Sequence, residues 1–125
     1  MSVENLWGEI PKPEDLRTPV SILREQAGIL GEVTNNVLEA EVVTQRDQRN
    51  IILRLYINAP AMDNYKYLAL WVEHGIELYP LTVEDDNRLY NCADEAEFKK
   101  GLRVILSSPE LRKVISSLIA QSTQV

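Results

Sequence analysis

The sequence is poor in the residues from which most catalytic and metal sites are built. It has one cysteine and one histidine among 125 residues, so it offers neither an internal disulfide nor a multi-histidine zinc site. Its five glycines are scattered and form no phosphate-binding loop. No apolar stretch approaches the roughly 20 residues that cross a bilayer. We therefore expect no metal, no cofactor and no membrane segment, and no residue pattern points to an enzyme.

Signals of export are missing as well. Residues 1–4 contain no basic region followed by an apolar stretch, which is the pattern of a secretory signal. The single cysteine agrees with a reducing compartment, so we expect a cytoplasmic protein. A hydrophobic content of 45% in 125 residues is enough for one domain with its own core.

The charge is negative overall and unevenly distributed. The net charge of -6 argues against nonspecific binding to nucleic acid, because such binding needs a basic footprint. Residues 1–45 have eight acidic and three basic side chains, whereas residues 98–125 have five basic and one acidic. The basic C-terminal segment either complements the acidic body internally, or is solvated, or docks an acidic partner.

The chain divides into an arm, a helix, a sheet and a helical end. We expect an extended N-terminal arm at residues 1–17, a helix at 18–36, an antiparallel sheet of four or five strands at 37–92, and two helices at 94–121. Short connections favour pairing of neighbouring strands, and helices on one face of such a sheet make two layers. The expected fold class is therefore α+β, with residues 1–125 forming a single domain.

Each predicted helix begins at a favourable cap. Thr18 and Ser108 each precede a proline, and a hydroxyl cap followed by proline at the first helical position is a favoured helix start. Asp94 precedes Glu97 by three residues, which resembles a capping box. Apolar residues then recur every three or four positions, as on the buried side of a helix.

Alternating polarity predicts the first two strands. Residues 37–44 and 51–58 each place their apolar side chains on one side, as half-buried strands do. We expect Val42 to lie opposite Leu53. This register also places Glu41 opposite Arg54 on the outer face of the strands, where their opposite charges attract.

Residues 65–83 are interpreted as a β-hairpin that turns at Gly75. A three-residue hairpin loop commonly ends in a left-handed glycine, and Gly75 would occupy that position. The resulting register pairs Val72 with Ile76 and places Leu68 on the same apolar face. The aromatic side chains then gather on the opposite face.

That aromatic face is the candidate binding surface. Aromatic residues and arginine are enriched in the centres of protein–protein interfaces, and a polar rim surrounds them. The candidate interaction residues are Tyr56, Tyr67, Trp71, Tyr79, Leu81 and Arg54. Alternatively, the N-terminal arm or a helix covers this face and makes it a second core.

His74 and Cys92 are the main candidates for chemistry. His74 would lie at the hairpin tip, which is usually solvated and offers a general base no pocket. Cys92 precedes a helix, where a thiol pKa is often lowered, but the acidic residues nearby oppose a thiolate. The acidic run 84–87 lacks the ligand spacing of a calcium loop, so we interpret it as a turn.

These patterns favour a small, acidic, non-enzymatic interaction module with a regulatory, inhibitor or chaperone-like role. It would present the aromatic face to a protein partner or to a second copy, and its acidity would favour basic partners. The alternative is a small enzyme or ligand-binding domain with a pocket between sheet and helices. That alternative falls if His74 and Cys92 lie far apart and neither of them borders a concave pocket. We expect no nucleic-acid partner.

Overall fold

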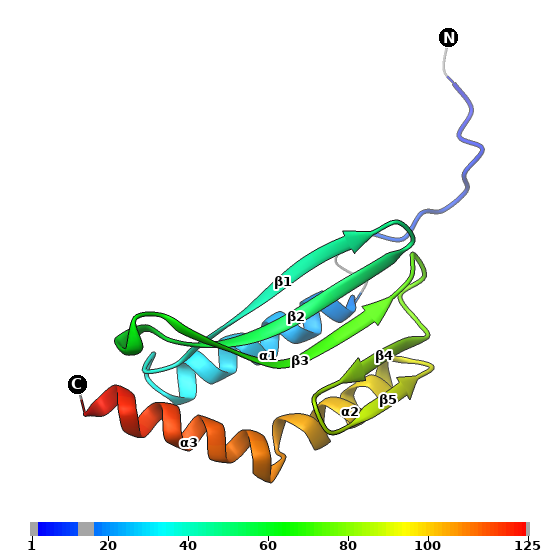
Figure 1. Cartoon of the computed structure of the whole chain (residues 1–125). Helices are drawn as coiled ribbons and strands as arrows, with labels where there is room; N and C mark the ends of the chain where they lie inside the picture. The colour runs from blue at the N-terminus through cyan, green and yellow to red at the C-terminus, as the bar shows by residue number, and fades with distance from the viewer. Residues whose placement is uncertain (1–2, 13–16, 125) are drawn as a thin grey trace.

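A five-stranded antiparallel sheet forms one layer of the molecule and three helices form the other (Figure 1). The computed structural model describes residues 3–12 and 17–124. Along the chain the elements are α1 (Pro19–Val33), β1 (Glu39–Asp47), β2 (Asn50–Ala59), the short 3-10 helix η2 (Pro60–Met62), β3 (Tyr65–His74), β4 (Leu81–Glu84), β5 (Leu89–Cys92), α2 (Glu95–Leu106) and α3 (Pro109–Thr123). The strands lie in the order of the sequence. The expected α+β layout is confirmed.

The helices begin where the capping signals placed them. The hydroxyls of Thr18 and Ser108 and the carboxylate of Asp94 each accept a hydrogen bond from the backbone N–H three residues later, at 3.2, 3.2 and 2.9 Å. Each cap satisfies a backbone donor that the first helical turn leaves without a partner. Local chemistry therefore sets the starts of all three helices.

All three helices pack on the same face of the sheet, which we call the inner face. Figure 1 shows α1 behind β1 and β2, and α2 behind β4 and β5. One core cluster joins α1 and α2 to the sheet around the fully buried ring of Phe98. A second cluster joins α3 to one end of β2 and β3. The inner-face residues of β2 alternate along the strand; they are Leu53, Leu55, Ile57 and Ala59.

A β-bulge at Ala69 changes which side chains of β3 face the helices. Leu55 lies opposite Leu70 and Tyr56 lies opposite Leu68, so Ala69 has no direct partner on β2. A bulge inserts one extra residue into one strand and shifts the alternation of faces by one. Leu70 therefore faces the helices, whereas Leu68 faces the other side of the sheet.

The predicted turn at Gly75 is wrong. β3 continues to His74, which pairs with Leu81, and the six residues 75–80 form a loop. Gly75 does not adopt the left-handed conformation that the predicted turn needs. Within this loop Tyr79 packs edge-on against Phe98 of α2, with 6.4 Å between the ring centroids, and the contact holds the loop against the helical layer.

The predicted register of the first two strands is wrong by two residues. Val42 lies opposite Leu55 rather than Leu53. Both strands extend beyond their predicted ends, because the polar residues next to the turn also pair in the ladder. The turn itself has only two residues, Gln48 and Arg49. The centre of the turn lies one residue later than predicted, and this moves the partner of every β1 residue by two positions along β2.

Phe98 should be the most sensitive position of the helical layer. Its side chain is fully buried, so Phe98→Ala should lower the free energy of unfolding by about 3–5 kcal/mol through lost burial and a residual cavity. Urea denaturation followed by circular dichroism measures the loss. As a control on the same helix, the exposed Val104→Ala should cost less than about 1 kcal/mol. Equal losses in the two variants would contradict the packing described.

Candidate functional site

The face of the sheet that points away from the helices carries a group of half-buried apolar side chains. We call this group the outer-face patch; its members are Val43, Ile52, Tyr56, Leu68 and Trp71. Val43 is 40% exposed, and the other four are partly exposed. Neither the helices nor residues 3–12 cover this patch in the described part of the chain, since the helices lie on the inner face and those arm residues are exposed.

Charged side chains surround the outer-face patch, and most of them are acidic. Arg54 lies in the ladder between Val43 and Trp71 and donates a hydrogen bond to Gln45 Oε1. Glu41 forms an ion pair with Lys66 at 2.6 Å, and the hydrogen bond to that ammonium lowers the pKa of the carboxyl. Further acidic residues on this face are Glu39, Glu73 and Glu84.

The structure brings three of the six predicted interaction residues together. Tyr56, Trp71 and Arg54 share the outer face, in neighbouring rows of the β2–β3 ladder. Leu68, which the sequence analysis assigned to the apolar core face, joins them because of the bulge at Ala69. An alanine inside an apolar run gives no sequence signal for a bulge, so this residue could not have been placed from the pattern alone.

The other three predicted residues lie on the inner side, and their assignment to the binding face is wrong. Tyr67 packs against the cluster of α3, because the bulge places it opposite the buried Ile57. Leu81 is 3% exposed and belongs to the main core. Tyr79 anchors the loop on Phe98, and burial raises the pKa of its phenol.

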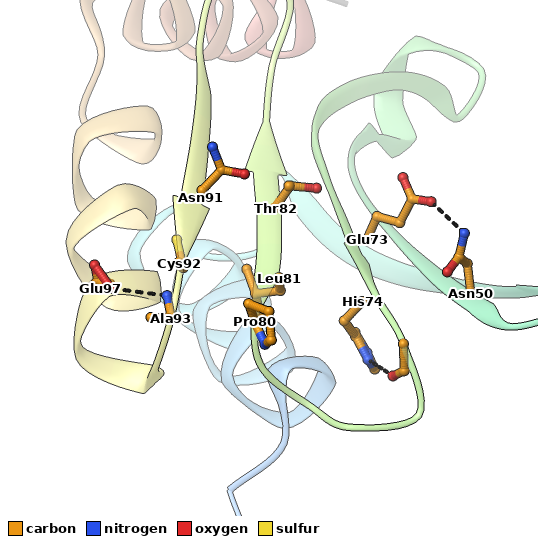
Figure 2. A pocket seen from close by; sticks show the side chains of 11 residues that line it. Asn50, Glu73, His74, Pro80, Leu81, Thr82, Asn91, Cys92, Ala93 and Glu97 are labelled. Carbon is orange, nitrogen blue, oxygen red and sulfur yellow. Dashed lines mark hydrogen bonds between the residues drawn. The ribbon is translucent and has the colours of Figure 1, made fainter.

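His74 and Cys92 border one depression of about 450 Å³ at the end of the sheet (Figure 2). The depression lies beside the 75–80 loop, and Glu97 of α2 closes one side of it. Figure 2 shows two printed contacts there: Asn50 donates to Glu73 at 3.0 Å, and the Ala93 N–H donates to Glu97 at 3.0 Å. Both residues thus border one open depression, and the alternative function stays a prediction.

The two reactive side chains are nevertheless not placed to act on each other. Leu81 pairs with both of them in the ladder, so they stand two strand spacings apart, roughly 10 Å. The Nδ1 atom of His74 lies 2.7 Å from the Gly75 carbonyl oxygen, to which a protonated Nδ1 donates. Burial, with smaller contributions from Glu97 and Asp94, raises the pKa of the Cys92 thiol. The arrangement offers no activated nucleophile.

The acidic turn after β4 is occupied by internal hydrogen bonds. The Asp85 carboxylate accepts from the backbone N–H groups of Asn87 and Arg88, both at 2.8 Å. The Arg88 guanidinium then bridges Asp85 and Glu110 of α3, at 3.3 and 3.0 Å. Among the described residues, no group of three or more His, Cys, Asp or Glu side chains is arranged to hold a metal ion. This turn stabilises the β4–β5 hairpin and joins it to α3.

Cys92 should be unreactive in the native state. A thiol that is 1% exposed and whose pKa is raised should react with a disulfide reagent roughly a hundredfold more slowly than in the unfolded chain, because the thiolate is the reacting form. Absorbance of the released thiolate in buffer and in denaturant measures the ratio. A native rate close to the denatured rate would show an accessible nucleophile and restore Cys92 as a candidate for chemistry.

No family model, no curated protein and no solved structure matches the chain. Across the described residues, no helix is both long and apolar enough to cross a membrane. Function must therefore be inferred from the chain's own surfaces, of which the outer-face patch is one that the helices leave partly exposed.

Proposed function

We propose that the protein is a small acidic interaction module that binds a partner protein through the outer-face patch. The observation that supports this proposal is the group of partly exposed rings and aliphatic side chains around Trp71 and Tyr56, on a sheet face that none of the described helices covers. Apolar groups left at a surface gain free energy when a partner removes them from water. A regulatory, inhibitor or chaperone-like role would use such a surface.

The composition of the outer-face patch suits an interface centre. Trp71 and Tyr56 are residue types that dominate binding energies, and Arg54 adds a donor between the strands. The patch lies on regular strands, whose positions are fixed by the ladder and the core beneath. A rigid surface loses less conformational entropy on binding than a loop would.

The charge of the rim favours a partner with basic groups. Glu39, Glu73 and Glu84 lie on the same face, and the chain as a whole carries a net charge of -6. Complementary charge speeds encounter and excludes wrong partners, and salt weakens the effect. We therefore propose a partner with an apolar centre surrounded by lysine or arginine.

A small-ligand site in the depression beside His74 and Cys92 is the second candidate. It is supported by the pocket's lining, which includes the carboxylates of Glu73 and Glu97 and the amide of Asn91. These groups suit a small cationic amine. Titration with a diamine such as putrescine should then shift the backbone amide resonances of these residues at about millimolar concentrations. Unshifted resonances would remove this candidate.

The Trp71→Ser/Tyr56→Ser double variant should lose the partner. Both rings leave the centre of the outer-face patch, and truncation of central aromatic residues weakens an interface by roughly tenfold or more. The measurement compares the proteins captured from a native lysate by the immobilised wild type and by the double variant. At least one protein with a basic surface should be lost, and its capture by the wild type should fall as salt rises.

A matched control removes two exposed apolar side chains elsewhere. Ile76→Ser/Val104→Ser changes the 75–80 loop and α2 and leaves the outer-face patch intact, so it should retain the partner. Circular dichroism confirms that both double variants fold. If a folded Trp71→Ser/Tyr56→Ser variant captures the same proteins as the wild type, the patch is not the binding surface.

A further inference from the structure

The N-terminal arm carries a row of large apolar side chains that are largely exposed to solvent. Val3, Leu6, Trp7 and Ile10 are 66% to 95% exposed. Figure 1 shows this part of the arm leading away from the sheet and the helices. Four such side chains in ten residues are costly to leave in water, because each exposes apolar surface that burial would remove. The arm therefore has the composition of a docking segment.

The spacing of this row is that of a helix that binds in a groove. The four residues stand at positions i, i+3, i+4 and i+7, which line one side of an α-helix. Ser2 precedes the row as a favoured N-cap type, and Pro11 follows it as a stop. In the free chain the segment is not helical: Gly8 has a φ of +72° and the Asn5 side chain accepts from the Trp7 N–H at 2.9 Å. Helix formation therefore requires a binding surface.

A groove of about 580 Å³ between α1 and α2 offers such a surface. Its floor is apolar and consists of Ile22, Leu102 and Leu106. On the α1 side, Ile29 and Val33 follow the groove residue Glu25 at intervals of four, and both remain exposed. The apolar surface of the groove thus continues along α1 for two further turns.

The rim of this groove is basic. Arg17 stands on the α1 side, and Lys99 and Arg103 stand on α2. Arg17 pairs with Glu25 at 3.1 Å and Lys99 pairs with Glu95 at 2.9 Å, whereas Arg103 has no ion pair with any described residue. The α2 side of the groove is therefore positive, whereas Arg17 and Glu25 neutralise each other on the α1 side, in a protein whose net charge is -6.

The arm has the complementary charge. If residues 3–10 form a helix, Glu4 and Glu9 lie roughly 110° from the centre of the apolar row, one on each side. One glutamate would then face the basic α2 side of the groove, and the other would face Arg17 on the α1 side. The outer-face patch is a poorer site for the same segment, because its rim is acidic and would repel both glutamates.

We infer that residues 3–10 of one chain fold as an amphipathic helix in the α1–α2 groove of a second copy. A second copy is the occupant because residues 3–12 lead away from α1 and α2, the two helices that form the groove of the same chain (Figure 1). A symmetric exchange of two arms would give a dimer with two identical contacts. The apolar row fills the floor of each groove, and the paired charges fix the register.

Sedimentation of the full chain tests the inference. The wild type should form a dimer of the 14.3 kDa chain, and Leu6→Ser/Trp7→Ser should weaken the dimer roughly tenfold or more. Two controls should leave the dimer unchanged: Ile76→Ser, which removes an equally exposed apolar side chain, and the outer-face variant Trp71→Ser/Tyr56→Ser. A single 14.3 kDa species at every concentration up to about 1 mM overturns the inference. A dimer that the arm variant does not weaken overturns it as well.

Charge exchange tests the groove itself. Arg103→Glu should weaken the dimer, and Glu4→Lys/Glu9→Lys should do the same. All three substitutions in one chain should restore association, because the arm is then basic and the groove carries an acid. If the combined variant does not restore association, the charges of the arm and of the groove do not contact each other.

Mixing two deficient variants separates exchange between copies from folding back within one chain. Leu6→Ser/Trp7→Ser keeps an intact groove, and Arg103→Glu keeps an intact arm. The mixture should contain a heterodimer held by one arm–groove contact, although each variant alone is largely monomeric. A mixture that behaves as the sum of its parts would mean that no arm occupies the groove of another copy, which contradicts the inference.

Discussion

The extra residue at Ala69 is the constraint on which both faces of the sheet depend. Without it, Leu68 and Leu70 would share one face of β3, and Tyr67 would lie beside Trp71 on the other. The bulge instead lets β3 supply apolar side chains to both core clusters along its whole length. It also leaves Trp71 and Leu68 together on the outer face. One unpaired alanine thus completes the core and adds Leu68 to the apolar surface opposite it.

The layout of the fold could be predicted because it is encoded locally. The caps at Thr18, Asp94 and Ser108 are short-range signals that tertiary contacts did not override. The faces of β3 could not be predicted, because residues 68–72 are apolar at every position and contain no polar side chain to mark the solvent side. The 75–80 loop was missed for a long-range reason: the contact between Tyr79 and Phe98 joins residues that no sequence pattern connects.

The candidate site was half predictable for the same reasons. Tyr56, Trp71 and Arg54 keep the shared face that the sequence predicts. Arg54 and Tyr56 lie on β2, which has no extra residue, and Trp71 lies in the part of β3 that follows the bulge. Beyond these residues the molecule presents surfaces of opposite character: an outer face with an acidic rim and a helical groove with a basic one. A partner with basic groups suits the first, and the acidic arm suits the second. Two distinct contacts can therefore form on one small chain without competing.

The most direct test of the account is the exposure of Leu68 and Leu70, which an unbroken strand would place on the same face. A soluble paramagnetic probe broadens the NMR signals of accessible methyl groups. The account predicts strong broadening for Leu68, together with the Trp71 ring, and little for Leu70, which is fully buried. Similar broadening of the two leucine methyl groups, or protection of Trp71 in the monomer, would contradict the bulge and the outer-face patch with it.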